Sequence, residues 1–218
     1  MIVGLCGFAG AGKSTVANYL VDQYDFTRLS FAAALKDVCA ALFHWDRARL
    51  EGRTPEDRAW REIPDEFWSK KMGQPWTPRY ALQYVGTEVM RNNLHRNIWV
   101  DRIAVQLHAL SPNARVVFDD ARFSNELSTI ESFDGTLLVL GRDTGNFTEE
   151  HRRLWNAAFD TTVPQPTTIT THLHPSETEW LIYPGIRTAP IVWNRDDFDT
   201  LYRNIDHWFA SVALRSLS

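Results

Sequence analysis

The 218-residue sequence predicts an α/β fold in which a parallel β-sheet carries helices on both faces. A nearly all-apolar run from Met1 to Cys6 is followed at once by a glycine-rich loop and a helical segment. Short apolar runs then alternate with helical patterns along the rest of the chain. The composition, 44% hydrophobic and 23% charged, is typical of a globular protein with a full core. We therefore expect a single domain, 1–218, organised around this sheet.

Each element is predicted from its own pattern. After the first strand, the segment 14–24 places Val16, Leu20 and Val21 on one helical face. Ser124 is the expected N-cap of a helix at 125–133. Further strands are expected at 114–118, 136–140 and 189–193. Further helices are expected at 31–43, 80–93, 98–110, 149–159 and 196–214. The helix at 31–43 has Leu35, Val38 and Leu42 at helical spacing, and the last helix has an apolar stripe of Phe198, Leu201, Ile205, Trp208, Phe209 and Val212.

Two segments interrupt the alternation. Residues 44–79 mix arginines and lysines with tryptophans and prolines, which is typical of a ligand-binding insertion or of a surface flap. Residues 142–176 form a polar excursion with a Thr- and Pro-rich arm at 161–171, and we expect it to be lid-like.

The bulk numbers exclude several classes of protein. A net charge of −4 lacks the basic excess of a general nucleic-acid binder. With only Cys6 and Cys39, a disulfide framework is not expected; both are predicted core thiols in a reducing compartment. No basic leader and no apolar run near the ~18 residues of a membrane span is found, so no membrane partner and a cytoplasmic location are expected.

The loop after the first strand is a phosphate-binding loop. Residues 7–14, GFAGAGKS, satisfy G-x-x-x-x-G-K-[ST] between a buried strand and an amphipathic helix, as the P-loop of an NTPase requires. The glycines let backbone N–H groups face the phosphates, and the helix N-terminus adds its dipole. We expect ATP to be bound by Gly7, Ala9, Gly10, Ala11, Gly12, Lys13, Ser14 and Thr15, with Lys13 reaching the β- and γ-phosphates.

A metal site is expected beside this loop. The Ser14 hydroxyl can ligate Mg²⁺, and a carboxylate at the end of another strand usually completes the metal shell. Asp119 and Asp120 follow the strand at 114–118 and occupy that place. The pleat sends neighbouring side chains to opposite faces, so the sequence leaves open which of the two faces the metal. His172 and His174 have no further ligand nearby and do not predict a second metal site.

Three observations favour a kinase over other P-loop proteins. The chain is too small for a RecA-like core with partner domains, and it has no N-K-x-D guanine-reading sequence. Phosphoryl transfer depends on positioning and on positive charge around the moving group. Arginines after sheet elements can supply this charge: Arg79, Arg91, Arg122, Arg142, Arg152 and Arg153.

A series of segments then resembles the bacteriophage deoxynucleoside monophosphate kinases. In chain order these are 31–36 (FAAALK), 60–62 (WRE), 77–79 (TPR), 82–88 (LQYVGTE) with Arg91, Trp99, 120–126 (DARFSNE), 174–177 (HPSE) and 193–194 (WN). The resemblance covers most of the chain, and the combination is more specific than any of its parts. It implies an NMP-kinase-like fold, ATP and Mg²⁺ as cosubstrate and cofactor, and a deoxynucleoside 5′-monophosphate as acceptor. For a phage-encoded protein it also implies the host cytoplasm.

The resemblance assigns roles to particular residues. It makes 44–97 an acceptor-binding insertion, with Lys36, Arg79, Gln83, Glu88, Arg91 and Trp99 in the acceptor pocket, and Asn194 near the ATP adenine. Arginines suit the acceptor phosphate through bidentate pairing, Gln83 and Glu88 suit a base edge or a sugar hydroxyl, and Trp68, Trp76 or Trp99 suits base stacking. Lys13, Asp120 and Arg122 are expected catalytic residues, and Arg152 is added to them from its place in the lid-like segment, not from the resemblance.

The chain also departs from the family pattern. Ala33-Ala34 stands where the family has Asp-Pro before Lys36, and no family residue maps onto 144–171. Two alternatives therefore stay open: a P-loop kinase of a hydroxymethylated base in phage DNA, for which Asp120 or Glu88 would serve as general base, and a nucleotide-binding module without turnover. The partners expected are nucleotides, with DNA as an alternative substrate and a homodimer as an open possibility.

Overall fold

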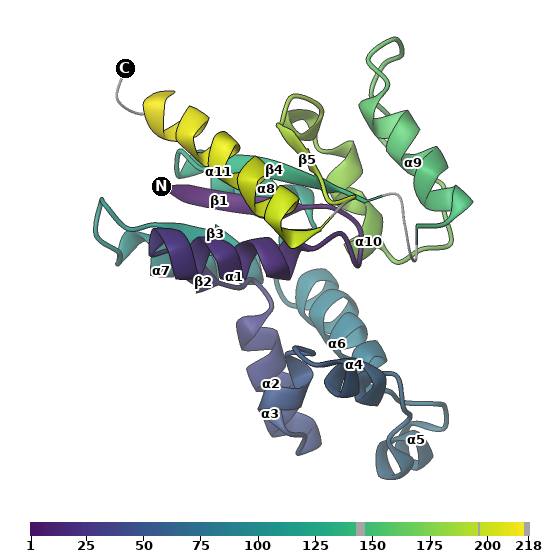
Figure 1. The fold of residues 1–218 in the computed structure, drawn as a ribbon. Coiled ribbons are helices and arrows are strands. Elements are labelled where there is room, and N and C mark those ends of the chain that lie inside the picture. Colours follow the sequence, from purple (N-terminus) through teal and green to yellow (C-terminus); the bar gives the residue numbers. More distant parts are fainter. Residues whose placement is uncertain (143–146, 196, 216–218) are drawn as a thin grey trace. The chain divides into compact units, whose positions relative to one another are not determined.

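The computed structural model describes residues 1–142, 147–195 and 197–215. These residues form two compact units (Figure 1). The first unit comprises Met1–Ser30 and Ala109–Ser218, and the second comprises Phe31–His108. Positions 143–146 of the expected lid and the expected helix start at Asp196 lie outside the described residues.

A five-stranded parallel sheet forms the centre of the first unit. Its strands are β1 (Ile2–Cys6), β2 (Thr27–Leu29), β3 (Val116–Phe118), β4 (Thr136–Gly141) and β5 (Ile191–Trp193), in the order β2-β3-β1-β4-β5. In the register, Val3 lies opposite Val117 on one side and Thr136 on the other. The predicted α/β fold is confirmed, and the central strands are buried on both faces as their unbroken apolar sequences predict.

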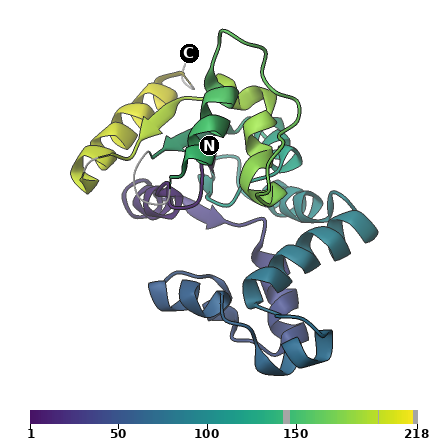
Figure 2. The ribbon, with the colours of Figure 1, turned by 90° about the vertical axis from the view of Figure 1, so that its right-hand side faces the viewer.

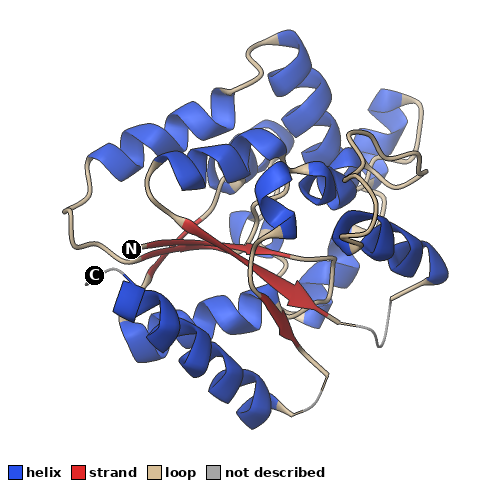
Figure 3. Cartoon of the chain, turned by 90° about the horizontal axis from the view of Figure 1, so that it is seen from above, coloured by secondary structure: helices blue, strands red, loops and turns tan. Residues whose placement is uncertain are grey.

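One face of this sheet is covered by α1 (Lys13–Tyr24) and α11 (Phe198–Arg215) (Figure 3). The buried residues of this layer include Val16 and Leu20, whose helical spacing predicts them. On α11 the stripe residues Leu201, Ile205 and Trp208 are buried, but Phe198 is 63% exposed and stacks against Tyr202 instead. The first turn of α11 therefore lies beyond the edge of the core.

The other face is covered by α8 (Ser124–Ser132), which in turn contacts the short helix η2 (Glu179–Ile182). A Cβ on Gly4 would lie 2.6 Å from Ile130 of α8, so the close approach of this helix to β1 depends on a glycine there. Ser124 is the first helical residue rather than the N-cap, which is Phe123.

The predicted lid-like segment forms part of the packed body of this unit. Helix α9 (Glu149–Phe159) buries Leu154, Trp155 and Ala158, and it packs against η2 (Figure 2). The Arg187 side chain, at the end of η3 (Pro184–Arg187), donates to the Ala158 carbonyl at 2.9 Å. The arm after α9 is held by Gln165, which donates to the carbonyls of Leu181 and Tyr183. The short helix α10 (Pro175–Thr178) precedes η2.

The second unit is helical. Its elements are α2 (Ala33–Phe43), α3 (Arg47–Leu50), α4 (Pro55–Arg61), α5 (Glu66–Met72), α6 (Pro78–Gln83), the π-helix η1 (Tyr84–Arg91) and α7 (Ile98–His108). Side chains cap the N-termini of several of these helices. Thr54 and Asp57 form a capping box on α4, and Asp46, Asp65 and Thr77 are the N-caps of α3, α5 and α6.

Aromatic residues fill much of the core of this unit. Phe43 stacks on Trp45 at 4.6 Å and meets Trp68 edge-on at 5.1 Å, while Trp76 is 4% exposed. The tryptophan surplus is therefore largely core packing. On α2 the buried side chains are Cys39 and Phe43, whereas Val38 and Leu42 of the expected apolar face are 39% and 57% exposed. Both cysteines are free, buried thiols, as predicted.

Candidate functional site

The P-loop backbone has the conformation that its glycines permit. Gly7, Gly10 and Gly12 have positive φ values of 142°, 81° and 100°. A Cβ on Gly7 would lie 2.5 Å from the Leu140 carbonyl oxygen, and one on Gly12 would lie 2.5 Å from the Asn194 amide nitrogen. Larger residues at these two positions would push the loop away from β4 and from Asn194.

Two side chains brace the loop from outside. Asn194, directly after β5, donates from its amide to the Ala11 carbonyl at 3.1 Å. Arg142, directly after β4, donates to the Gly10 carbonyl at 3.0 Å. Both residues follow the carboxyl ends of strands next to the loop, where open parallel sheets bind their ligands.

The Lys13 ammonium lies over the loop from which it projects. It donates to the carbonyls of Gly7 and Phe8 at 2.7 and 2.9 Å. Burial, reinforced by the charge of Arg122, lowers the pKa of Lys13 to about 8. The negative charge of a bound triphosphate would stabilise the protonated form of Lys13, since the free loop does not supply that opposite charge.

A strand-end carboxylate is bonded to the P-loop serine. The Ser14 hydroxyl donates to Asp119 Oδ2 at 2.7 Å, and Asp119 is 7% exposed. Asp120 instead accepts from the Ser30 hydroxyl at 2.6 Å. Of the two aspartates that the sequence leaves open, Asp119 is the one joined to Ser14.

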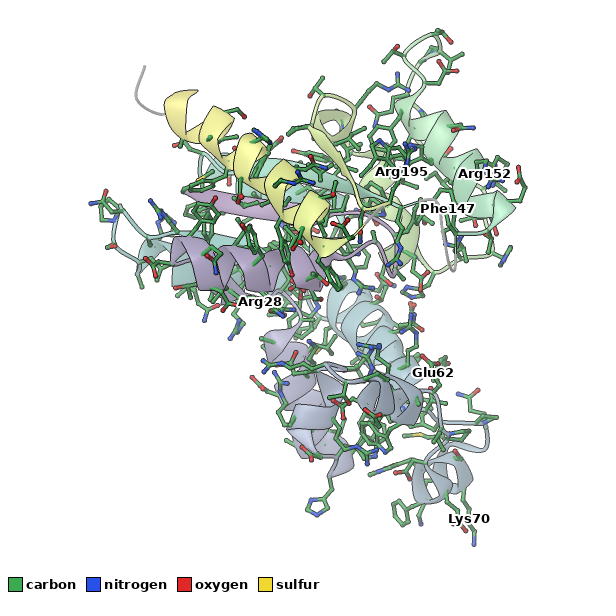
Figure 4. The ribbon with its side chains drawn as sticks, viewed as in Figure 1. Arg28, Glu62, Lys70, Phe147, Arg152 and Arg195 are labelled. Carbon is green, nitrogen blue, oxygen red and sulfur yellow. The ribbon has the colours of Figure 1, made fainter. Side chains whose placement is uncertain are left out.

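Arg28, on β2, completes this cluster, and Figure 4 labels its side chain near α1. Its guanidinium binds both carboxylate oxygens of Asp119: Nε donates to Oδ1 at 2.9 Å, and a terminal nitrogen donates to Oδ2. The same group donates to Asn18 Oδ1 at 3.1 Å. Arg28 thus brings a full positive charge to the place where the sequence predicts a metal.

The oxygens present suit Mg²⁺. Among the described residues, no group of three or more His, Cys, Asp or Glu side chains could hold a metal by itself. Mg²⁺ bound with a nucleotide needs no such cage, since it takes one or two protein oxygens together with phosphate oxygens and water. Ser14 and Asp119 supply hard oxygen donors of that kind.

Arg122 is held in place through its backbone. Glu126 of α8 is 3% exposed and accepts from the backbone N–H groups of Arg122 at 2.7 Å and Phe123 at 3.1 Å. A second carboxylate, Glu179, accepts from the Ser124 N–H at 3.0 Å. The loop between β3 and α8 is thereby fixed by two acidic side chains.

These elements line a small pocket next to the P-loop. Its lining brings together the two expected cations, Lys13 and Arg122, with Gly7, Ala9, Ser176, Glu177 and Trp180. The 120–126 and 174–177 segments, distant in sequence, therefore meet at the loop. Two positive side chains around one small space are suited to a phosphate group.

An aromatic cluster packs against the loop, and its Trp180 also lines the pocket. Phe8, at a variable position of the motif, is 5% exposed. Its ring lies 4.6 Å from His151 and 5.4 Å from Trp180, both edge-on, and also contacts Phe147 and Trp155. Figure 4 labels Phe147 and Arg152 beside α9. Helix α9 is thus packed against the P-loop through Phe8.

Five of the expected acceptor residues lie on elements of the second unit that contact one another. Helix α2, which carries Lys36, packs against α6 and η1. A Cβ on Gly86 would lie 2.6 Å from a terminal methyl of Leu35, so a larger residue there would require the Leu35 side chain to shift. The residues on α6 and η1 are Arg79, Gln83, Glu88 and Arg91.

Several of these side chains are paired within the unit. The Lys36 ammonium donates to Glu51 at 2.7 Å, and Arg79 lies 3.4 Å from Glu62. Burial of Glu51 opposes ionisation, but the hydrogen bonds and charges of Lys36 and Arg47 outweigh it and lower the pKa of Glu51 to about 2. Glu88 accepts from the Asn92 amide at 2.8 Å.

Within the helix expected at 80–93, the residues Tyr84–Arg91 form a π-helix rather than an α-helix. π-helices are rare overall, but those that do occur are often located at functional sites. Trp99 supports it: the indole is 5% exposed and its N–H donates to the Gly86 carbonyl at 3.1 Å. This contact fixes the buried indole in the second unit, and a role of Trp99 in the acceptor pocket stays a prediction.

Comparison with known proteins adds a relative to this geometry. Over 152 residues, the chain is 35% identical to a protein of Acanthamoeba polyphaga mimivirus named "Putative deoxynucleotide monophosphate kinase". The match covers 65% of this chain and 74% of the relative. The chain belongs to the deoxynucleotide monophosphate kinase family. The predicted family is thus confirmed, while a bacteriophage origin stays a prediction.

Other comparisons are less informative. No protein-family model matches the chain. Solved structures with a similar chain course include TT1252 from Thermus thermophilus (TM-score 0.43, 16% identity, 97% of each chain), a sugar kinase from Janibacter sp. (TM-score 0.38, 14% identity, 96% of this chain and 94% of that one) and a gluconokinase from Sinorhizobium meliloti (TM-score 0.36, 14% identity, 96% and 95%). Scores this low support no inference about mechanism. Within the described part of the chain, no helix has the length and apolarity to cross a membrane.

The arginine expected to act from the lid is on the outer surface of this kinase. Arg152 pairs with Glu149 one turn away on α9, and half of its side chain is exposed. Arg153 donates to the Thr170 carbonyl at 3.1 Å. Neither residue lines the pocket that holds Lys13 and Arg122. A catalytic role for Arg152 stays a prediction that this arrangement does not support.

Sequence reasoning missed three residues of the kinase site. Arg28 lies in a strand of three residues that lacks an apolar pattern, Phe8 occupies a variable position of the motif, and Glu126 was part of the family resemblance without an assigned role. Only Glu126 carries a usable signal, since an acidic residue at the third position of a helix is typical of an N-terminal cap.

Proposed function

We propose that this protein transfers the γ-phosphate of ATP to the phosphate of a deoxynucleoside 5′-monophosphate, giving the diphosphate and ADP. One observation carries the proposal: the P-loop cation Lys13 and Arg122 line the same pocket, with the Ser14–Asp119 pair at the start of α1. Membership of the family, together with the relative's name, supports a deoxynucleotide as the acceptor.

The residues of the site have separate proposed roles, which follow from their charges. The P-loop N–H groups and Lys13 would bind the β- and γ-phosphates, and for this Lys13 would turn from the carbonyls of Gly7 and Phe8. Arg122 would neutralise charge that develops on the moving phosphoryl group. Ser14 and Asp119 would hold Mg²⁺, whose charge, when bound, screens the triphosphate oxygens.

The chemistry requires no general base. An oxygen of the acceptor phosphate, already anionic at neutral pH, forms the new P–O bond as the bond from the γ-phosphorus to the β,γ-bridging oxygen breaks. ADP keeps the electron pair of that bond. Asp120, bonded to Ser30, is therefore proposed as a support of the loop before Arg122 rather than as a base.

The acceptor is proposed to bind in the second unit. Lys36, Arg79 and Arg91 are the proposed phosphate ligands, and Gln83 and Glu88 the groups that contact the base or sugar, since all five lie on packed helices of this unit. The chain replaces the family's Asp-Pro with Ala33-Ala34, so the base preferred by this protein is a question for the assay.

The test is an acceptor screen. ADP release would be measured with dTMP, dGMP, dCMP, dAMP and hydroxymethylated analogues, and transfer of labelled phosphate from ATP would be measured with duplex DNA that contains hydroxymethylated bases. We expect turnover with at least one free monophosphate and its loss in Arg122→Met. Arg115→Met is the matched control, because Arg115 binds the Tyr24 carbonyl and the Phe209 ring.

Each result has a consequence. Labelling of DNA without turnover of free nucleotides would replace the proposal by a DNA-base kinase. ATP binding without any acceptor-dependent turnover would replace it by a nucleotide-binding module.

A further inference from the structure

The Asp119 carboxylate is fully engaged before any ligand arrives. Its Oδ2 accepts from the Ser14 hydroxyl and from a terminal nitrogen of Arg28, and its Oδ1 accepts from Arg28 Nε at 2.9 Å. At 7% exposure it has little access to water. A planar guanidinium thus covers both oxygens of the carboxylate, the pairing geometry that arginine favours.

This arrangement opposes cation binding at the same carboxylate. The guanidinium is a planar, delocalised cation with a full positive charge. A divalent ion that approaches Asp119 meets a carboxylate already neutralised, and it is repelled by the cation that neutralises it. Arg28 also has another acceptor, Asn18 Oδ1 at 3.1 Å, to which it stays bonded if it releases the carboxylate.

The ion pair is not needed to attach the strand. β2 pairs with β3 through backbone bonds along its whole length, with Arg28 opposite Val117 and Leu29 opposite Phe118. Arg28 lies on an edge strand, and a third of its side chain is exposed. A purely structural role would leave unexplained why the charge is directed at the carboxylate beside Ser14.

We propose that Arg28 is an internal counter-cation that competes with the divalent metal for Asp119 and so sets the metal affinity of the P-loop. This inference rests on the proposed function, which places the metal at Ser14 and Asp119. It assigns to Arg28 a tuning role: metal binds when the combined charge of ion and nucleotide displaces the guanidinium from one or both oxygens.

The experiment measures metal binding by the full-length protein. Free Mn²⁺ would be followed by electron paramagnetic resonance during titration, with a saturating non-hydrolysable ATP analogue. Arg28→Gln keeps an N–H donor near Asp119 and removes the charge, and Arg28→Met is a second neutral variant. We expect Mn²⁺ to bind roughly ten-fold more tightly to both, because one repelling charge has been removed. Arg28→Lys, which keeps the charge, should stay near the wild type, and Arg115→Gln should not change.

A double-mutant cycle tests the route. If Arg28 acts through the carboxylate, the gain from Arg28→Gln disappears when Asp119 is already Asn. Unchanged or weaker Mn²⁺ binding in the folded neutral variants, or an equal gain in the Asp119→Asn background, would overturn the inference. If the wild-type protein does not bind the ATP analogue, the result counts against the proposed nucleotide site instead. A failure of the Arg28 inference and a failure of the proposed function are therefore distinguishable.

Discussion

Replacing Phe8 by Ala should show that the P-loop is held by its aromatic neighbours. The ring is 5% exposed and contacts Phe147, His151, Trp155 and Trp180, three of them edge-on. Truncation of a buried phenylalanine costs roughly 3–5 kcal/mol in the free energy of unfolding, through lost burial and the cavity left behind. We expect a value in the upper half of that range, because edge-on aromatic contacts add about 0.5–1.5 kcal/mol each.

Urea unfolding followed by tryptophan fluorescence would measure this loss, because Trp155 and Trp180 report on the same cluster. Phe198→Ala is the matched control: its ring is 63% exposed, so less than about 1 kcal/mol should be lost. Phe8→Leu keeps part of the buried volume, so its loss of unfolding free energy should lie between those of Phe8→Ala and Phe198→Ala. A loss below about 1 kcal/mol for Phe8→Ala would refute the anchoring role.

Three further predictions follow from charged side chains. The pKa of Lys13 is lowered from 10.5 to about 8 in the folded protein, so the unfolded chain binds more protons between these two pH values. The free energy of unfolding should therefore rise with pH over that range by up to about 3 kcal/mol. Unfolding of Lys13→Met, measured as a function of pH, should lack this rise. The pKa of Glu51 is lowered to about 2 from 4.5, so stability present above pH 4.5 should be lost as pH falls toward 2, by about 1–2 kcal/mol after solvent screening, and Glu51→Gln should flatten acid unfolding. Glu126→Ala should remove about 2 kcal/mol and slow turnover, whereas Glu126→Gln, which still accepts a hydrogen bond, should recover part of both in unfolding and kinetic assays.

The parts of the site that the sequence predicted are those encoded by contiguous residues. The P-loop motif specifies its own backbone, because Gly7 and Gly12 are needed for conformations and close contacts that other residues cannot adopt. The aspartates were predicted from their position after an apolar run. Their division between Ser14 and Ser30 was not predictable, since it depends on which side of the sheet each side chain faces.

The parts that the sequence missed depend on tertiary contacts. β2 has only three residues, and Thr27 and Arg28 are polar neighbours, so neither alternation nor an apolar run marks it. Its partner β3 supplies the backbone ladder that makes it a strand. In the predicted lid-like segment the helix at 149–159 is present, but its burial of Leu154 and Trp155 depends on tertiary contacts; a lid function stays a prediction. Hydrophobic periodicity also cannot distinguish a π-helix from an α-helix over eight residues.

That π-helix has a consequence for protein engineering. A wide turn contains one residue more than the α-helical turn it replaces, so it behaves as a one-residue insertion accommodated inside a continuous helix. Deleting a single residue between Val85 and Val89 should let the segment revert to α-helical hydrogen bonding while α6 persists before it. The deletion would also rotate the residues that follow it, so Arg91 would point in a new direction relative to Tyr80. The Gly86 carbonyl would move away from the Trp99 indole N–H that it accepts from.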